Sequence, residues 1–408
     1  MRNGFDIEKV RADFPILSHP VRGHRLVFLD SGASAQKPRQ VLDKEREVYE
    51  TGYANVHRGL HYLSEEATAN YEGARVKIAG FINARHSHEV LYTKGTTEGI
   101  NLVASSYGRK FLTEGDEVII THMEHHSNIV PWQMLRDEVG IVLKVIPVDD
   151  DGSFHLDQFR ELITERTKIV SVTHVSNVLG TVVPIKQVCQ IARDAGAISL
   201  IDGAQGIVHL PIDVQDIGCD FYAFSGHKLY GPSGIGVLYG REELLNEMPP
   251  YQGGGDMIET VTFEKTTWAD LPHKFEAGTP PITQAIALGA AIDYVRDIGI
   301  EAIGDHEAGV LNYATQQLAS VEGLRLIGTA AGKASVISFA MDCAHPHDIS
   351  TIIDQQGVAI RAGHHCAQPL MDRFDLPSTA RVTLGMYNDR DDIDALVQSL
   401  EKVREIFA

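Results

Sequence analysis

Residues 167–205 read TKIVSVTHVSNVLGTVVPIKQVCQIARDAGAISLIDGAQ, and they predict a β-strand, an α-helix and a second β-strand in succession. TKIVSV and ISLI are short apolar runs that end in polar or small residues, whereas PIKQVCQIARDAGA between them has a helical pattern. Similar strand patterns recur in EVIITHMEHH, IVLKVIPV and GCDFYAFSGHK. This alternation favours βα units, and therefore a mostly parallel sheet with helices on its faces.

A different pattern follows the segment PITQAIALGAAIDYVRDIG, which itself predicts one long helix. Short strands (ASVISFAMD, GVAIRAG, ARVTLGMY) alternate there with helices (HDISTIIDQQ, DDIDALVQSLEKVREIF). A length of 408 residues also favours more than one domain. We therefore expect an α/β protein with a large domain at residues 30–295 and a smaller α+β domain formed by residues 1–29 and 296–408.

The composition limits the class of function. A net charge of −19 argues against a nucleic-acid-binding protein, which would carry a basic face. The segment MRNGFDIEKVRADF lacks an apolar core of signal-peptide length, and no run approaches the roughly 20 apolar residues of a membrane span. Four cysteines without CxxC or zinc spacing predict free thiols in a reducing compartment. We therefore expect a cytoplasmic protein with no nucleic-acid and no membrane partner.

Lys228 lies in SGHKLYGPSG, directly after a predicted strand. A lysine in such a turn is ordinarily a surface residue, but Asp202 ends the neighbouring apolar strand in LIDGAQ. In open α/β sheets ligands bind at the carboxyl edge of the strands. A carboxylate at that edge could pair with a protonated ring nitrogen of a ligand.

Candidate phosphate-binding residues lie near the same edge. Thr96 and Thr97 in KGTTEGIN begin a predicted helix, where free N–H groups and the helix dipole favour an anion. Further polar side chains near the edge are those of Gln205, Ser225 and His227. Together with Lys228 and Asp202, these are the parts of a pyridoxal 5′-phosphate (PLP) site: a Schiff-base lysine, an acidic partner for the pyridinium and a phosphate cup.

The chain resembles the class V aminotransferase group of fold-type I PLP-dependent transferases, and more narrowly the SufS-type (group II) cysteine desulfurases. The resemblance covers essentially the whole chain. It rests on motifs that occur in order: ANVHRGLHYLS, KGTTEGINLVA, EHHSNIVPWQ, THVSNVLGT, DGAQ, FSGHKLYGPSGIG, FEAGTP and RAGHHCAQPL. It implies PLP as the cofactor and a small domain that carries a catalytic cysteine loop.

The resemblance also implies roles for the cofactor-binding residues. Lys228 would form the Schiff base and move the substrate's Cα proton, Asp202 would pair with the pyridine nitrogen, and His125 would stack on the ring. Gln205 would contact the phenolic oxygen. The phosphate would be held by Thr96, Thr97, Ser225 and His227. Thr279 in EAGTP would reach the phosphate of a partner subunit, which implies a homodimer with shared sites.

By the same resemblance, the enzyme would convert L-cysteine to L-alanine and hold the sulfur as a persulfide on Cys366. Arg361 and Asn177 would bind the substrate carboxylate, because a planar guanidinium binds a carboxylate with two hydrogen bonds. Arg381 is ranked below Arg361 and could anchor either the substrate or the loop. The thiolate of Cys366 is the reactive form.

His364 and His365 either assist that thiolate or fix the loop by hydrogen bonds, and the sequence favours neither reading. Only four residues separate Arg361 from Cys366, so the loop could position the cysteine but could not carry sulfur far. We therefore expect sulfur transfer to a docking protein of the SufE or SufU type, for iron–sulfur cluster assembly. His347 in AHPHDIS could engage a zinc-containing SufU-type partner, or it could be an exposed histidine at a helix start.

Two other functions remain open at this stage. A selenocysteine lyase of the same group would not depend on Cys366. A non-enzymatic sulfur or metal carrier built around HHC would bind metal and show no visible Schiff-base absorption, but Lys228 with Asp202 argues against it. Because strand alternation would send His125 and His126 to opposite sides, we expect no metal site in EVIITHMEHH and none elsewhere.

Overall fold

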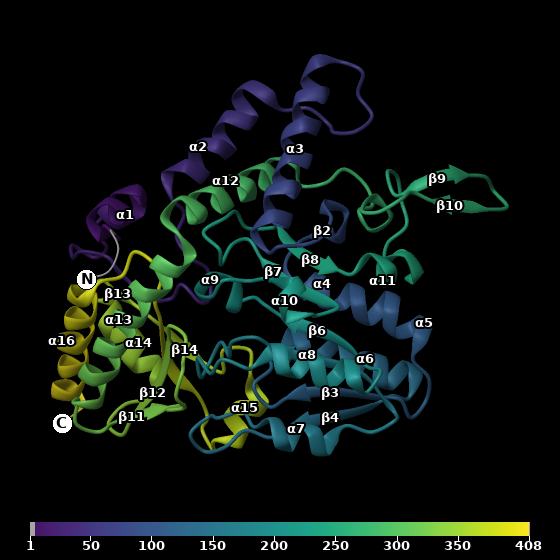
Figure 1. Ribbon diagram of the computed structural model, residues 1–408. Helices are drawn as coiled ribbons and strands as arrows, with labels where there is room; N and C mark the ends of the chain where they lie inside the picture. Colours follow the sequence, from purple (N-terminus) through teal and green to yellow (C-terminus); the bar gives the residue numbers. More distant parts are fainter. Residues whose placement is uncertain (1–4, 408) are drawn as a thin grey trace.

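The computed structural model in Figure 1 describes residues 5–407. Residues 1–4 and 408, which belong to the predicted small domain, lie outside the described residues. The central sheet has the strand order β2-β8-β7-β6-β5-β3-β4. Its strands are β2 (Val90–Thr93), β3 (Glu117–Thr121), β4 (Val142–Ile146), β5 (Thr167–Thr173), β6 (Ile198–Asp202), β7 (Phe221–Ser225) and β8 (Gly236–Gly240).

Every neighbouring pair in this sheet is parallel except the two that β8 makes with β2 and β7. Side chains of β3 alternate between two apolar cores, with Ile119 in one and Val118 and Ile120 in the other. Both faces of the sheet are therefore buried, as expected when helices cover both sides. The prediction of an α/β fold with a mostly parallel sheet is confirmed.

The helices of the sequence up to residue 298 enclose this sheet. The long predicted helix is α12, and it packs against α2 and α3 on one side of the molecule (Figure 1). Their bounds are α2 (Arg39–Glu47), α3 (Tyr62–Phe81), α4 (Thr96–Leu102), α5 (Arg109–Phe111), α6 (Val130–Val139), α7 (Leu156–Leu162), α8 (Ile185–Asp194), α9 (Gly206–His209), α10 (Val214–Ile217), α11 (Glu242–Glu247) and α12 (Ile282–Ile298).

A second sheet, entirely antiparallel, has the order β11-β12-β15-β14. This sheet shares an apolar core with helices of the C-terminal part. That core is separate from the two apolar cores of the large sheet. The elements of this part are α13 (Ile300–Ala319), β11 (Leu324–Ile327), β12 (Val336–Met341), α14 (Pro346–Asp354), β13 (Val358–Ala359), β14 (Arg361–Gly363), α15 (Gln368–Arg373), β15 (Thr379–Thr383) and α16 (Arg390–Phe407).

The N-terminal segment contacts both parts of the molecule. Strand β1 (Val27–Phe28) pairs with β13, and Arg11, in α1 (Ile7–Asp13), forms an ion pair with Asp392 of α16. Phe14, in contrast, packs edge-on against Tyr230, which lies between β7 and β8 of the large sheet. The assignment of residues 1–29 to a small domain, with a boundary after residue 295, stays a prediction.

One hairpin and the character of the helices complete the description of the fold. The hairpin of β9 (Ile258–Val261) and β10 (Thr266–Trp268) projects away from the body of the molecule (Figure 1). Among residues 5–407, no helix combines the length and the apolar character that crossing a bilayer requires.

The large sheet determines where a ligand can bind. β5 ends at Thr173, β6 at Asp202 and β7 at Ser225, so three polar side chains lie at one carboxyl edge. The register pairs Thr173 with Asp202 directly. This edge is the expected position of a ligand site in an open α/β sheet.

Packing at this edge predicts a large effect of Gly236→Ala. An added Cβ would overlap Gly95 Cα and lie 2.6 Å from Phe224 O, both backbone atoms. We expect the free energy of unfolding to fall by about 1–3 kcal/mol, measured by denaturant titration. The control is Gly309→Ala at an exposed position of helix α13, where the Cβ meets no atom within 4 Å and the substitution should stabilise by about 0.5–1 kcal/mol. Equal effects of the two substitutions would contradict this account.

Candidate functional site

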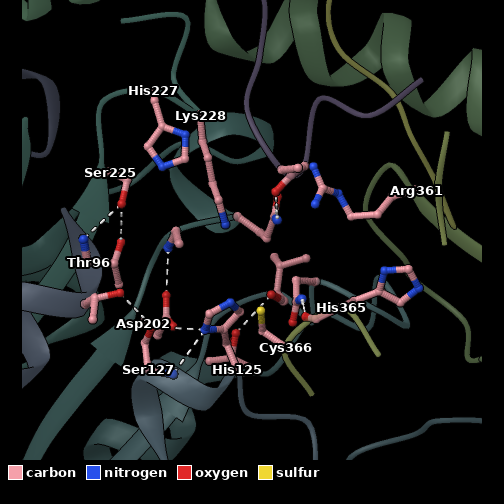
Figure 2. A pocket seen from close by; sticks show the side chains of 18 of the residues that line it. Thr96, His125, Ser127, Asp202, Ser225, His227, Lys228, Arg361, His365 and Cys366 are labelled. Atoms are coloured by element: carbon pink, nitrogen blue, oxygen red, sulfur yellow. Dashed lines mark hydrogen bonds between the residues drawn. The ribbon is translucent and has the colours of Figure 1, made fainter. Parts of the chain in front are cut away.

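A cavity of about 280 Å³ lies at the carboxyl ends of β5, β6 and β7. It brings together side chains from sequence segments that are far apart, as Figure 2 shows. Of the residues singled out from the sequence, thirteen line it: Thr96, Thr97, His125, Asn177, Asp202, Gln205, Ser225, His227, Lys228, Arg361, His365, Cys366 and Arg381. Thr279, His347 and His364 do not line it.

Lys228 follows β7 and extends its amine into the cavity (Figure 2). Burial lowers the pKa of Lys228 to about 8, although the carboxylate of Asp202 opposes this change. Burial also raises the pKa of Asp202, whose Oδ1 accepts a hydrogen bond from the Ala204 backbone N–H (2.9 Å). A lysine whose lowered pKa leaves a substantial fraction of its amine neutral near physiological pH can act as a nucleophile toward an aldehyde and as a base.

Gln205 supplies a test of whether a cofactor fits here. Its Nε2 donates to the backbone oxygen of Gly32 (2.8 Å), whereas its Oε1 is buried without a hydrogen-bond partner among the described residues. Buried polar atoms are nearly always paired, so an unpaired one on a cavity wall favours a bound group. With Lys228 and Asp202 on the same walls, the residues fit the aldehyde, the ring nitrogen and the ring oxygen of PLP.

Three of the four predicted phosphate-binding residues, Thr96, Thr97 and Ser225, lie at the start of α4, and His227 lines the same cavity. The backbone N–H of Thr96 donates to Ser225 Oγ (2.9 Å), and the two hydroxyl groups are 2.8 Å apart. Thr97 Oγ1 shares a hydrogen bond with Ser127 Oγ (2.7 Å). Gly95 precedes the helix with φ +153°, and a Cβ there would lie 3.1 Å from Ser225 Oγ. A helix start surrounded by hydroxyl groups is suited to bind a phosphate.

His125 lies in a turn, so the expected strand alternation through His125 and His126 is wrong. β3 ends at Thr121, whose Oγ1 donates to Glu124 Oε1 (2.6 Å) and accepts from the Met123 N–H (3.0 Å). These local hydrogen bonds end the strand before the histidines. His125 Nδ1 accepts from the Ser127 N–H (3.1 Å). Burial lowers the pKa of His125 to about 3, so a neutral ring faces the cavity.

The two arginines share one carboxylate, Asp30, which the sequence analysis missed. Arg361 Nη2 donates to Asp30 Oδ2 (2.8 Å), and Arg381 Nη2 donates to Asp30 Oδ1 (3.3 Å). Arg381 is buried, its Nη1 donates to the Asn177 backbone oxygen (2.9 Å), and burial lowers its pKa to about 10. Its Nε has no partner among the described residues. Arg381 thus lies deeper than Arg361 and has an unpaired donor among the described residues, while the ranking of the two arginines as substrate ligands stays a prediction.

The loop between β14 and α15 holds Cys366 at the cavity. His365 and Cys366 both have left-handed backbones, with φ +52° and +54°, which is costly for residues other than glycine. The structure compensates with hydrogen bonds from outside the loop. The His126 N–H donates to the Cys366 backbone oxygen (2.7 Å), and His126 Nε2 accepts from the Gln368 N–H (3.0 Å). Asn177 Nδ2 donates to the His365 backbone oxygen (2.7 Å).

His365 fixes this loop and carries no charge. Its Nε2 contacts Thr379 O (3.1 Å) and Thr379 Oγ1 (2.9 Å), and burial lowers its pKa to about 3. Of the two readings left open, the hydrogen-bonding one describes His365, because a neutral ring offers no imidazolium to a thiolate. His364 is exposed. His347 is also exposed, in α14, where its ring stacks on His345 at 5.2 Å.

Comparisons with known proteins agree with this geometry. Residues 27–396 match the family described as Aminotransferase class-V. A cysteine desulfurase of Yersinia pseudotuberculosis serotype O:1b (strain IP 31758) is 51% identical over 403 residues, 98% of this chain and 99% of the relative. The crystal structure of Escherichia coli cysteine desulfurase CsdA (S-sulfonic acid) has a TM-score of 0.93 and 39% identity, covering 100% of both chains. The apo cysteine desulfurase of Thermococcus onnurineus NA1 has a TM-score of 0.93 and 36% identity, covering 99% and 100%.

The lowered pKa of Lys228 predicts how its reactivity depends on pH. With a pKa of about 8, roughly one tenth of the amine is neutral at pH 7 and about half at pH 8, whereas an ordinary lysine is almost fully charged. We expect the rate of Schiff-base formation between cofactor-free protein and excess PLP to rise with pH with a midpoint near 8, followed by visible absorption. Nα-acetyllysine at the same pH values corrects for the titration of PLP. A profile that still rises steeply above pH 10 would contradict the prediction.

Proposed function

Since the chain belongs to the aminotransferase class-V family and is a PLP-dependent cysteine desulfurase, we propose that Cys366 is the residue that receives the sulfur. The observation that carries the proposal is that Cys366 and Lys228 line the same cavity. Cys366 is also exposed, so its sulfur lies between the interior of the site and solvent. Cys189 and Cys219 are buried, and Cys343, like them, does not line the cavity.

The cavity residues would hold PLP as the sequence predicts. Lys228 binds its aldehyde, Asp202 its ring nitrogen and Gln205 its ring oxygen, while the hydroxyl cluster at Thr96 and Ser225 binds its phosphate. When bound, PLP supplies an electron sink that stabilises negative charge at the substrate's Cα and thereby weakens the Cβ–Sγ bond. The Lys228 amine takes the Cα proton, a role that its lowered pKa supports.

Three residues would orient L-cysteine. Arg361 and Arg381 face the cavity beside Asn177, and the unpaired Arg381 Nε offers a donor for the substrate carboxylate. Asp30 holds both guanidinium groups and leaves the arginine–Asp30 group with one net positive charge. That remaining charge is what a substrate carboxylate would neutralise.

The sulfur step requires a bond exchange. The Cys366 thiolate attacks the sulfur of L-cysteine, a new S–S bond forms, and the Cβ–Sγ bond breaks with its electron pair left on carbon. The methyl group of L-alanine then gains one proton, which balances the proton that the Cys366 thiol lost, and Lys228 returns to Cα the proton that it took. The loop hydrogen bonds from His126 and Asn177 support this step, because they hold the cysteine backbone in one position.

We place the enzyme among the SufS-type desulfurases, handing its persulfide to a SufE- or SufU-type acceptor for iron–sulfur cluster assembly. The hydrogen-bonded loop between β14 and α15 supports this proposal. Because the loop restricts the movement of Cys366, the acceptor protein would have to bind close to the cysteine. The exposed and stacked His345 and His347 support a zinc-containing SufU-type acceptor, while an ordinary helix start remains the alternative. A cytoplasmic location is supported by the four free cysteines.

We also propose a homodimer. Leu60 is 98% exposed and Phe263, at the tip of the projecting hairpin, is 107% exposed. Covering these side chains with a second chain would remove apolar surface from water, which is favourable. Thr279 lies outside the cavity of its own chain, and its predicted contact with the phosphate of a partner subunit accords with that position.

Replacing Cys366 tests the proposed function. We expect Cys366→Ser to release L-alanine from L-cysteine at less than about one hundredth of the wild-type rate with a thiol reductant present, because the nucleophile is lost. Visible Schiff-base absorption should stay unchanged, since Lys228 is intact. Cys343→Ser, which alters an exposed thiol outside the cavity, is the control and should keep full activity. Equal release by Cys366→Ser would instead favour the selenocysteine lyase alternative.

The role of His126 can be tested separately. His126→Ala leaves the exposed Gln368 N–H without its protein acceptor, which costs about 0.5–1.5 kcal/mol and loosens the cysteine loop. We expect kcat for L-alanine release to fall by roughly fivefold or more, with KM for L-cysteine little changed because the arginines are untouched. His126→Gln, which retains an acceptor, should recover part of the rate. An increase in KM at constant kcat would show that His126 acts on the substrate and not on the loop.

A further inference from the structure

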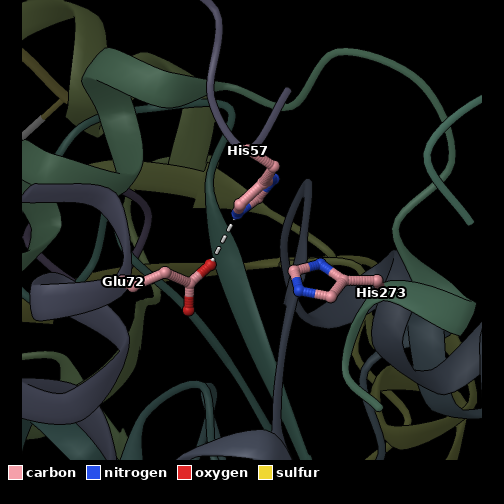
Figure 3. A group of neighbouring side chains, drawn as sticks. All are labelled: His57, Glu72 and His273. Carbon is pink, nitrogen blue, oxygen red and sulfur yellow. Dashed lines mark hydrogen bonds and ion pairs between the residues drawn. The ribbon is translucent and has the colours of Figure 1, made fainter. Parts of the chain in front are cut away.

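A cluster of two histidines and one glutamate lies outside the cavity of Lys228. His57 comes from the loop before α3, Glu72 from α3 itself, and His273 from the turn η6 (His273–Phe275). Their ligand atoms all lie within 4.8 Å of one another. Figure 3 shows the two imidazole rings and the carboxylate pointing toward a common space. The three residues are far apart in the sequence, so no spacing motif could reveal them.

The cluster is held in place by its own contacts. His57 Nε2 lies 2.9 Å from Glu72 Oε1, and the rings of His57 and His273 are 4.6 Å apart in an edge-on arrangement. His57 has φ +71°, a left-handed backbone that is costly for histidine. Its N–H donates to Thr68 Oγ1 (2.8 Å), which anchors the strained residue to α3. Such strain, when the surroundings maintain it, is concentrated at functional positions.

A second layer of residues orients the glutamate. Arg75 Nε donates to Glu72 Oε2 (2.8 Å), and Arg75 Nη1 donates to Glu276 Oε1 (2.7 Å). The Arg75 side chain is only 1% exposed, so this arrangement is rigid. Two carboxylates around one guanidinium leave one net negative charge next to the imidazole nitrogens of His57 and His273. Known metal sites have the same organisation, in which outer hydrogen bonds hold the ligating carboxylate.

We propose that His57, Glu72 and His273 bind a divalent first-row transition metal ion, with Zn²⁺ the ion of this class that the donor set fits best. Two imidazole nitrogens and one carboxylate oxygen are a recognised set of three protein ligands that leaves a fourth position for water. Ligands around tetrahedral zinc lie roughly 3.3 Å apart, so the widest separation must close by about 1.5 Å. His273 is half-buried on a short turn, and rotation of its side chain can supply that movement.

The bound ion would join three separate segments of the chain. It would connect the loop that carries His57 to helix α3 and to the segment that leads from His273 to Thr279. His57 is exposed in the single chain, so the ion has a path from solvent before two chains associate. This site goes beyond the desulfurase reaction, because none of its ligands lines the cavity that holds Lys228 and Cys366.

The test is zinc binding by the holoenzyme after chelator treatment and removal of free PLP. A Cys366→Ser background excludes the reactive thiol as a ligand. We expect about one tightly bound Zn²⁺ per chain by equilibrium dialysis and elemental analysis, and at least a tenfold loss of affinity in His57→Ala and in His273→Ala. The matched control is His155→Ala, which removes an exposed imidazole–carboxylate pair (His155 Nε2 to Asp149 Oδ2, 2.6 Å) and should not change the affinity.

Two further readouts keep the result decisive. Visible absorption of the bound cofactor shows whether each variant is folded, and His273→Gln is a milder substitution should His273→Ala fail. Co²⁺ in place of zinc should give d–d bands that depend on His57 and His273. Absence of retained zinc in the Cys366→Ser protein, or equal zinc affinity with and without His57 and His273, would overturn the proposal and leave the cluster a hydrogen-bonded histidine–glutamate pair.

Discussion

The parallel register of β5 and β6, which sets Thr173 beside Asp202, is the constraint on which the site depends. It buries a carboxylate at the carboxyl edge of a sheet whose two faces are already covered by apolar cores. The next strand, β7, ends at Ser225 and delivers Lys228 to the same edge. Burial then lowers the pKa of the lysine and raises that of the aspartate. Both changes favour the neutral form of the side chain, because a buried charge loses its hydration. A cofactor that offers partners to both groups relieves this unfavourable burial.

The loop that carries Cys366 is held in position by hydrogen bonds from residues that follow strands of the large sheet. β14 and β15 place the loop beside the large sheet, and His365 and Cys366 adopt left-handed backbones there. His126, which follows β3, and Asn177, which follows β5, hold the loop by hydrogen bonds to its backbone groups. The consequence is a thiol whose position is defined but whose reach is small. This short reach is the reason for proposing that an acceptor protein docks to receive the sulfur.

Particular residues show how far sequence reasoning reaches. Lys228, Asp202 and Cys366 stand out because each occurs in a distinctive motif, and the structure places all three on one cavity. Asp30 could not be found in this way, since its role is to hold two arginines from the other end of the chain. The strand expected through His125 failed because side-chain hydrogen bonds at Thr121 end β3 early, and such local competition is invisible in an apolar pattern.

The sequence by itself determined the α/β class, the family and the identity of the residues that could carry chemistry, because hydrophobic periodicity and contiguous motifs are local properties of the chain. Only the tertiary structure decided which charges are buried together, that Arg381 lies deeper than Arg361, that His365 is neutral, and that His57, Glu72 and His273 converge. The physical reason is that burial and pairing depend on contacts between segments far apart in the sequence. Those contacts set the electrostatic environment of each group, and no single segment contains that information.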